Sequence, residues 1–272
     1  MIRINELPVP LDYTPALLRQ AILTRLGIAD SDLLEVSLFK RSHDARRKRH
    51  GIVFVCIVDV AVRDEAAVLA RLAADRQVGP APDTGYHPVA QAPATLTERP
   101  IIVGFGPGGL FAALLLAQMG FRPIVLERGR EVRQRTQDTW GLWRRHTLDA
   151  ESNVQFGEGG AGLFSDGKLY SQIKDPKFYG RKVMHEFVRA GAPPEILYVS
   201  RPHIGTFRLT GVVSRMRQEI IALGGEVRFG SKVTDLVIDN GQVLGVVLEN
   251  GETLRSRHVV LALGHSSRDT FR

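Results

Sequence analysis

The sequence has 272 residues, 44% of them hydrophobic, which is enough to bury one large core or two smaller ones. Its formal net charge is +7, and Cys56 is its single cysteine, which excludes an internal disulfide. The most apolar helical stretch, residues 110–119, is far shorter than the roughly 20 residues of a membrane span. Since the first residues also lack the apolar run of an export signal, we expect a cytoplasmic protein with no membrane contact.

Residues 1–78 predict a small domain of alternating strands and helices. Apolar periodicity and turn residues indicate, in chain order, a strand at 2–4, a helix at 15–26, strands at 33–39 and 52–60, and a helix at 65–75. This βαββα order lacks only a final strand of the ferredoxin-like fold. We therefore predict a ferredoxin-like α+β domain over residues 1–78.

A basic segment at residues 40–50 lies between two of these strands. It contains six Lys or Arg and one acid, which is enough to attract a polyanion. One interpretation is a nucleic-acid-associated protein that binds phosphates through Arg46, Arg47, Lys48 and Arg49; the other is a solvated basic loop. Because no aromatic residues are interleaved as single-strand binding prefers, a nucleic-acid partner is the less favoured interpretation.

Residues 79–99 predict a proline-rich linker, and from residue 100 the pattern changes. Five prolines lie between residues 78 and 100, with no regular apolar period. A strand, a glycine turn, a helix and a second strand then follow, before an irregular glycine-rich stretch, a helix and further strands. The sequence thus predicts a second domain, of α/β class, over residues 100–272.

The glycine turn carries the clearest functional signal. Gly104, Gly106 and Gly109 form GxGxxG directly after the apolar strand, and Pro107 and Gly108 begin the helix. In a dinucleotide-binding turn the first glycine permits the bend, the second admits a diphosphate to the backbone, and the third lets helix and strand pack closely. The phosphates then lie at the start of the helix. The alternative is a glycine turn that serves only tight packing.

The second strand of this domain ends at Glu127, 23 residues after Gly104. A carboxylate at this position accepts hydrogen bonds from the ribose of an adenosine half and disfavours a 2′-phosphate. Downstream, five glycines crowd residues 157–167. Such density suits a backbone laid against a flat ring, but it also suits a mobile surface loop.

Several segments together carry a resemblance to a known family. They are VGFGPGGLFAALLLAQMGFRPIVLERG, ESNVQFGEGGAGLFSDGKL, GAPPEILY, RPHIGT and VVLALGHSSRDTF. In these the chain resembles a bacterial family of uncharacterised FAD-dependent, NAD(FAD)-utilising dehydrogenases, related to glutathione-reductase-like flavoproteins. The resemblance covers nearly the whole chain, including the small leading domain.

The resemblance implies FAD as cofactor and a set of contacts for it. It places the diphosphate over residues 106–109, the adenosine ribose at Glu127 and Arg128, and the adenine near the backbone of Val233. It brings the segment with Gly159, Gly160, Ser165, Asp166 and Lys168 toward the isoalloxazine and ribityl chain, with Gly264 closing near the cofactor. Lys168 beside the ring would stabilise an anionic reduced flavin; the alternative is a solvated surface lysine.

The same resemblance implies a Rossmann-like FAD-binding domain with a parallel sheet and a β-meander. Asn-Gly pairs at 240–241 and 250–251 predict the hairpin turns of that meander. We expect the strand at 227–233 to join the parallel sheet. Members of the family run much further than residue 272, so the domain is expected to be incomplete at its C-terminus, where residues 266–272 suggest the opening of another helix.

These features predict an FAD-dependent oxidoreductase of unknown substrate, with NAD(P)H suggested as electron partner by the family's name alone. The alternatives are a nucleic-acid-associated flavoprotein that uses the basic segment at residues 40–50, and a non-catalytic FAD-binding fragment. The histidines lack metal-ligand spacing, and no catalytic residue is assigned. His203 and His265 lie in motif-like segments and are candidates for either acid–base or structural roles, while Trp140 and Trp143 are interpreted as packing residues.

Overall fold

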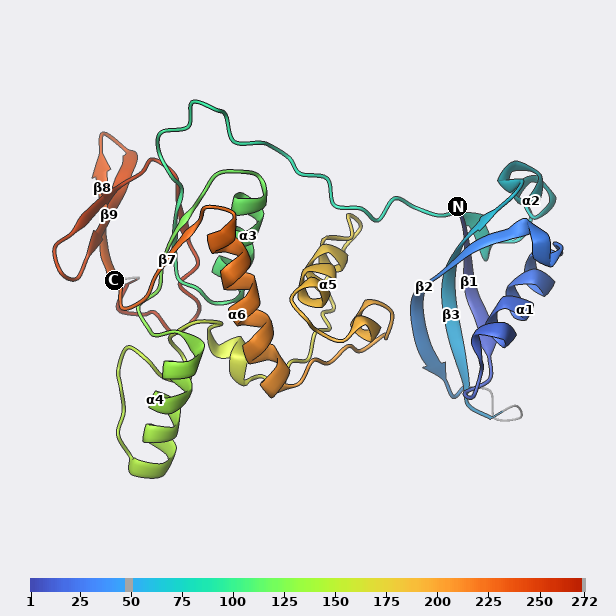
Figure 1. The fold of residues 1–272 in the computed structure, drawn as a ribbon, viewed down its shortest axis with the longest axis horizontal. Coiled ribbons are helices and arrows are strands. Elements are labelled where there is room, and N and C mark those ends of the chain that lie inside the picture. The colour runs from blue at the N-terminus through green and yellow to red at the C-terminus, as the bar shows by residue number, and fades with distance from the viewer. Residues whose placement is uncertain (47–50, 271–272) are drawn as a thin grey trace. The chain divides into compact units, whose positions relative to one another are not determined.

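The structure is a computed structural model that describes residues 1–46 and 51–270 (Figure 1). Two compact units make up the chain. The first contains Met1–Gly85, Leu169–Met184 and Pro193–Pro202; the second contains Tyr86–Lys168, His185–Ala192 and His203–Arg272. The sequence predicted two consecutive domains, so the return of two later segments to the first unit is a difference from that prediction.

The first unit has the ferredoxin-like topology. Its four strands are antiparallel in the order β2-β3-β1-β4, with α1 and α2 as the connecting helices. In chain order the elements are β1 (Ile2–Val9), α1 (Pro15–Leu26), η1 (Asp30–Asp32), β2 (Leu33–Asp44), β3 (Val53–Val62), α2 (Glu65–Arg71) and β4 (Val78–Pro80). The missing final strand is therefore present as β4, inside the segment where the sequence predicted the linker to begin.

Local signals explain the position of α1 in this unit. The Thr14 side chain accepts a hydrogen bond from the Leu17 N–H, Pro15 occupies the first turn, and Gly27 ends the helix with a left-handed φ of 61°. The apolar face of α1 packs with the strands in a core that includes Ile4, Ile22 and Val60. Cys56 is buried in this core, where desolvation raises the pKa of its thiol.

Two later segments complete the first unit, where the sequence predicted only irregular structure. The 3₁₀ helix η3 (Pro194–Leu197) and the first part of α5 (Tyr179–Arg189) belong to them. The guanidinium of Arg181, on α5, lies 4.3 Å from the Phe39 ring centroid, and that of Arg3 lies 3.7 Å from it. Val199 forms a bridge with Arg41 at the β2 edge. These contacts attach the segments to the sheet.

The second unit contains a four-stranded parallel sheet. Its strands are β5 (Ile101–Val103), β6 (Ile124–Leu126), β7 (Glu226–Arg228) and β11 (Val259–Leu261). Their order, β11-β5-β6-β7, is that of a Rossmann-like sheet, in which the first strand lies between the second and the last. The predicted fold class, with its parallel and antiparallel sheets, is thus present.

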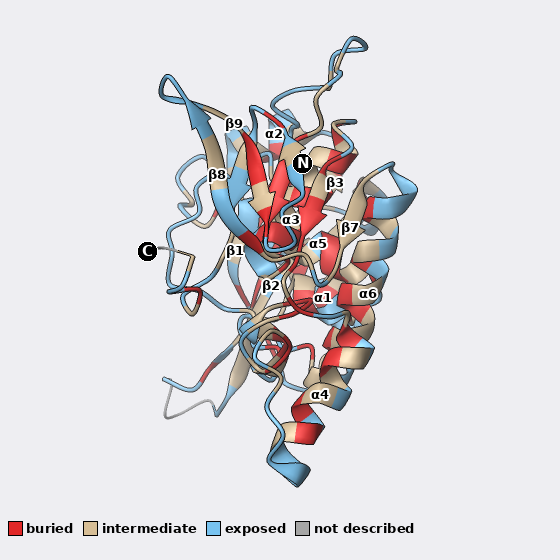
Figure 2. Cartoon of the chain, turned by 90° about the vertical axis from the view of Figure 1, so that its left-hand side faces the viewer, coloured by how far each residue is buried: buried red, intermediate tan, exposed pale blue. Residues whose placement is uncertain are grey.

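Helices and a second sheet cover the parallel sheet. The helices α3 (Pro107–Gln118) and α6 (Thr206–Ala222) pack against each other, and α3 also contacts the parallel strands. In Figure 2 the buried residues of α6 form a stripe along one side, as an amphipathic helix requires. The 3₁₀ helix η2 (Ala161–Phe164) contacts α6, and α4 (Val132–Arg145) follows β6 in the chain.

The predicted β-meander forms the antiparallel sheet of this unit. It consists of β8 (Val233–Asp239), β9 (Gln242–Leu248) and β10 (Thr253–Arg255), in the order β10-β9-β8. Asn240 and Gly241 turn the first hairpin with φ values of 48° and 77°. Val246 and Leu248 pack with Ile101 of the parallel sheet. This outcome corrects the prediction for residues 227–233, since only β7 joins the parallel sheet and Val233 begins the meander.

The last described residues also differ from the prediction. The predicted helix opening covered residues 266–272. Turns occupy the described part, up to residue 270, and residues 271–272 lie outside the described residues. Ser267 is buried, and its hydroxyl donates to the Leu263 carbonyl at 2.7 Å. This short segment therefore folds back toward the end of β11.

Candidate functional site

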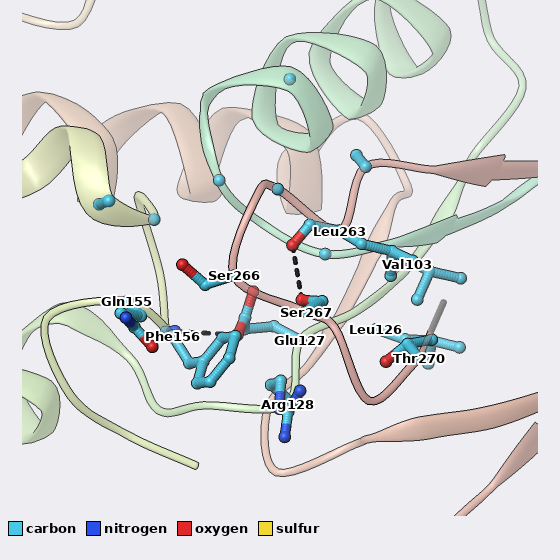
Figure 3. Close-up of a pocket in the computed structure, with 18 of the residues that line it drawn as sticks. Val103, Leu126, Glu127, Arg128, Gln155, Phe156, Leu263, Ser266, Ser267 and Thr270 are labelled. Atoms are coloured by element: carbon cyan, nitrogen blue, oxygen red, sulfur yellow. Dashed lines mark hydrogen bonds between the residues drawn. The ribbon is translucent and has the colours of Figure 1, made fainter. Parts of the chain in front are cut away.

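A cavity of about 380 Å³ opens in the second unit where β5, β6 and β11 end (Figure 3). Its walls come from the glycine turn and the start of α3, from residues 126–128, from residues 155–162, and from residues 231–233 and 262–270. The carboxyl ends of parallel strands are where open α/β sheets bind their ligands, and the volume lies within the roughly 300–1,000 Å³ of small-molecule pockets.

Close packing explains two of the three glycines in the motif. Gly104 has a φ of +98°, and a Cβ there would lie 2.5 Å from the Ala262 carbonyl oxygen. A Cβ at Gly109 would lie 1.9 Å from the Gly104 carbonyl oxygen. Neither position accepts a side chain without moving backbone. Gly109 is therefore a packing residue of the turn, and it is absent from the cavity lining of the described chain.

Gly106 is different, because the protein leaves room for a side chain there. Its φ is −71°, and a Cβ would find its nearest neighbour, the Gly160 Cα, at 3.6 Å. Gly106 lines the cavity together with Pro107 and Gly108. The requirement for glycine at this position therefore does not come from the packing of the described chain.

The start of α3 faces the cavity without a side-chain cap. Gly106 is the N-cap residue and, in the described chain, no side-chain hydrogen bond caps this end. The first N–H groups of a helix have no partner within the helix, and the helix dipole adds positive potential there. Pro107 has no N–H, so the backbone donors among the cavity-lining residues of this helix start are the N–H groups of Gly106 and Gly108. The site offers these donors to an anionic ligand.

Glu127 lies on the wall beside this helix start and is 4% exposed. Its Oε2 accepts the Phe105 N–H at 2.7 Å, and its Oε1 accepts the N–H groups of Gly129 at 2.8 Å and Gly157 at 3.0 Å. A carboxylate has about four acceptor positions. Glu127 thus holds three segments of the cavity wall together and retains capacity for one further donor.

Arg128 lines the same wall but is engaged by protein groups. Its guanidinium lies 4.0 Å from the Phe156 ring centroid, forms an ion pair with Glu151, and donates to both carboxylate oxygens of Asp269 at 2.9 and 3.1 Å. Burial lowers the pKa of Arg128, but the hydrogen bonds to Glu151 and Asp269 outweigh it and leave that pKa above its usual range. The positive charge of Arg128 is therefore matched by two carboxylates.

Lys232 is engaged in the same way. It pairs with Glu249 at 3.1 Å and with Glu151 at 3.3 Å, and the hydrogen bond to Glu249 raises its pKa. The two cationic side chains on the cavity wall are thus both neutralised by neighbouring acids.

The glycine-rich segment lies over a buried arginine that the sequence analysis missed. Arg135, on α4, is 0% exposed and donates to backbone carbonyls of residues 153–160. Burial lowers its pKa to about 10. A Cβ at Gly157, where φ is +117°, would lie 2.5 Å from the Arg135 Cδ. The glycine at 157 is therefore needed for close contact with this side chain.

The structure brings most of the predicted cofactor residues to the cavity. The lining includes Gly104, Gly106, Pro107, Gly108, Glu127, Arg128, Gly160, Val233 and Gly264. Gly159 packs beside the cavity, where its N–H donates to the Phe105 carbonyl at 2.9 Å. Two more of the five crowded glycines, Gly157 and Gly162, also line it. Residues that the sequence analysis did not single out line it too: Gln155, Phe156, Ala161, Ser231, Lys232, Ala262, Ser266, Ser267 and Thr270.

Ser165, Asp166 and Lys168 lie outside the cavity lining of the described chain. The Ser165 hydroxyl donates to the Gly162 carbonyl at 2.7 Å. Asp166 lies 3.4 Å from the His203 Nε2, and both side chains are exposed; Lys168 forms a backbone bridge with His203. The predicted contact of these three residues with a bound ring stays a prediction.

The remaining candidates have separate outcomes. His265 lines the cavity. Trp143 contacts Phe164 edge-on with ring centroids 6.1 Å apart, but Trp140 and Trp143 are both exposed, so neither is a core residue as the packing interpretation implies. In the basic segment, Arg46 pairs with Asp44 at 2.9 Å, whereas Arg47, Lys48 and Arg49 lie outside the described residues.

In the described part of the chain, no group of three or more His, Cys, Asp or Glu could hold a metal ion. None of the helices in that part is both long and apolar enough to cross a membrane.

Comparison with known sequences gives one domain match and one relative. The Domain of unknown function (DUF8436) matches residues 1–61. An uncharacterized protein of Clostridium beijerinckii is 42% identical over 270 residues, which cover 99% of this chain and 50% of the relative. The chain therefore spans about half the length of this curated relative.

Solved structures of low identity resemble part of the chain. The THI4 protein of Thermovibrio ammonificans has a TM-score of 0.40 and 21% identity, over 62% of this chain and 58% of that chain. A 3-ketosteroid-delta4-(5alpha)-dehydrogenase of Rhodococcus jostii has a TM-score of 0.39 and 17% identity, over 63% and 48%. A thioredoxin reductase of Lactococcus lactis has a TM-score of 0.34 and 14% identity, over 62% of this chain and 36% of that chain. At these TM-scores the likenesses decide nothing about chemistry, and the fold assignment rests on the strand order.

Proposed function

We propose that the second unit binds FAD in this cavity and that the protein is an FAD-dependent oxidoreductase. The observation that carries the proposal is the start of α3, which is opened by GxGxxG, lacks a side-chain cap and faces a cavity at the ends of parallel strands. A diphosphate fits this donor set, because its negative charge matches N–H groups that have no partner within the helix.

The rest of the cavity supports an adenine dinucleotide in one orientation. Glu127 retains one acceptor position for a ribose hydroxyl, and the consecutive residues Ser231, Lys232 and Val233 line the cavity. We place the adenosine half there and the flavin half toward residues 160–162 and His265. Bound FAD would supply hydride transfer, while this chain's residues would bind and orient it.

Titration with FAD tests the binding proposal. The purified chain, freed of any bound flavin, is titrated with FAD and followed by flavin fluorescence and by the visible spectrum. Saturable one-to-one binding is expected, and ADP should compete because it contains the diphosphate and ribose that the cavity recognises. Absence of saturable binding would refute the proposal.

Reduction tests separate an oxidoreductase from a binding module. The protein, loaded with FAD, is mixed with NADH or NADPH without oxygen, and bleaching of the flavin band is measured. Bleaching identifies a nicotinamide electron donor, which we propose as the partner. If FAD binds but neither donor nor any tested substrate changes its redox state, the non-catalytic alternative replaces the oxidoreductase.

A further inference from the structure

A single buried side chain organises the glycine-rich wall of the cavity. The Arg135 guanidinium donates to five backbone carbonyls at 2.6–3.3 Å, those of Asn153, Val154, Gly157, Glu158 and Gly160. It is fully buried and lies outside the cavity lining of the described chain. Arg135 therefore holds the backbone of the cavity wall from its buried side, away from the cavity.

This pattern fixes the direction of the peptide N–H groups in the loop. In a trans peptide the N–H points opposite to the C=O, so a carbonyl that accepts from Arg135 sends the next N–H away from it. The peptide between Glu158 and Gly159 follows this rule. Its carbonyl lies 2.6 Å from the Arg135 Nη1, and its N–H donates at 2.9 Å to the Phe105 carbonyl in the glycine turn.

The next such peptide joins Gly160 to Ala161. The Gly160 carbonyl lies 2.8 Å from the Arg135 Nη1, so the Ala161 N–H points away from the guanidinium. Ala161 lines the cavity, and within residues 1–46 and 51–270 no acceptor takes its N–H. The position is also next to the start of α3, since a Cβ at Gly160 would lie 2.9 Å from the Gly106 Cα.

We infer that Arg135 is a positioning residue for the diphosphate. By holding the Gly160 carbonyl, it turns the Ala161 N–H toward the cavity as a second donor beside the start of α3. This inference rests on the proposed function, because it assumes an anionic ligand between these two sets of N–H groups. Under this inference, Arg135 contributes to ligand binding although its side chain contacts no ligand.

Removing the donor itself gives the sharpest test. Ala161→Pro removes this N–H and puts the Cδ of the proline ring in its place, and proline is tolerated at the first position of a helix such as η2. Gly160, with ψ of −162°, already has the extended ψ that precedes proline. We expect the Kd values for FAD and ADP to rise about tenfold or more, the loss of one charge-assisted hydrogen bond. The Kd for adenosine, which lacks the diphosphate, should stay unchanged.

Variants of Arg135 test the positioning role. Arg135→Lys keeps the charge but has at most three donors for five carbonyls, so the diphosphate ligands should lose affinity while adenosine does not. Arg133→Lys, at an exposed position of the same helix, is the matched control. Arg135→Ala with millimolar guanidinium added back should regain FAD affinity, because the cation can reoccupy the vacated site.

The outcomes distinguish the inference from the proposed function. If the unaltered chain does not bind FAD, the proposed function has failed. If it binds FAD and Ala161→Pro binds FAD and ADP equally well, the inference is wrong while FAD binding stands. A parallel loss of FAD and adenosine affinity in Arg135→Lys would assign Arg135 a general structural role and overturn the positioning role.

Discussion

Replacing Gly106 with alanine separates the needs of the fold from the needs of a ligand. The backbone of Gly106, with φ of −71°, is accessible to any residue, and the new methyl would meet its nearest neighbour at 3.6 Å, an ordinary van der Waals contact. Alanine restricts the unfolded chain, which stabilises by about 0.4–1 kcal/mol, but it is a poorer N-cap by a similar amount. The net change in unfolding free energy should therefore be within about 1 kcal/mol.

Gly106 lines the cavity, so under the proposed function the same methyl would lie where the diphosphate approaches the backbone. Each charge-assisted hydrogen bond that is lost to a longer distance costs about 1.5–3 kcal/mol, or roughly ten- to a hundredfold in Kd. We expect Gly106→Ala to weaken FAD binding at least tenfold while leaving the melting temperature of the free protein within about 4 °C of that of the unaltered chain.

Fluorescence and FAD titration measure the two effects on one sample. Both tryptophans, Trp140 and Trp143, lie on α4 in the second unit, so their emission follows the unfolding of the unit that contains the cavity. Gly211→Ala, on α6 and outside the cavity, is the control for a glycine-to-alanine change. If Gly106→Ala binds FAD as the unaltered chain does, the diphosphate does not lie over this residue, and the reasoning is refuted.

The remaining predictions concern the turn, the closing segment and the charges. Gly104→Ala should destabilise the second unit by about 2–4 kcal/mol in denaturant titrations, because it combines a left-handed φ with a Cβ 2.5 Å from backbone; unchanged stability would contradict this packing. The hydrogen bond from Arg128 lowers the pKa of Asp269 below its usual 3.8, so this pair stabilises the fold at neutral pH and stops doing so as the pH falls through the folded-state pKa. Asp269→Asn should therefore speed backbone hydrogen exchange at residues 264–270 at pH 7 but not in acid. If the variant and the unaltered chain exchange at the same rate at pH 7, the Arg128–Asp269 pair does not stabilise this segment. Finally, the Kd for FAD should change little between low and moderate salt, whereas a steep increase would contradict recognition by neutral backbone donors.

Local signals were sufficient wherever a short stretch of chain determines its own structure. The helix at Pro15–Leu26 was predicted with its observed bounds because its cap, its proline and its terminal glycine all lie within the sequence window. The start of α3 and the Asn240–Gly241 turn were predicted for the same reason. Each of these features is fixed by backbone preferences of the residues themselves.

Features that depend on distant partners were missed. The strand β4 has three residues, two of them Gly79 and Pro80, so it has no apolar period and exists because β1 pairs with it. The helix α5 was also missed, because the sequence before it is rich in glycine. A start signal was nevertheless available there, since Asp175 accepts the Tyr179 N–H. Its attachment to the first unit depends on Arg3 and Phe39, far away in the chain.

Arg135 illustrates the same limit for the site. On sequence it is one arginine among several in an amphipathic helix, and arginine is rarely buried without an acidic partner. Its direct partners here are carbonyls of a loop whose conformation depends in turn on glycines and on Glu127. A pattern search identifies the glycines but not the cation that makes their conformation useful.

The charge arrangement around the cavity explains why backbone groups, rather than side chains, should recognise a phosphate there. Arg128 and Lys232 are the basic side chains on the described wall, and each is already paired with acids at or near hydrogen-bonding distance. To reach a ligand, either would have to leave a partner and expose a carboxylate close to the phosphates. The N–H groups at the start of α3 and at Ala161 require no such exchange. Among the described residues they have no acceptor to give up, and they are held in place by glycine packing and by Arg135. A preorganised set of neutral donors binds an anion without releasing an ion pair, and this is the physical reason for expecting affinity that depends on Gly106 and Ala161 but little on salt.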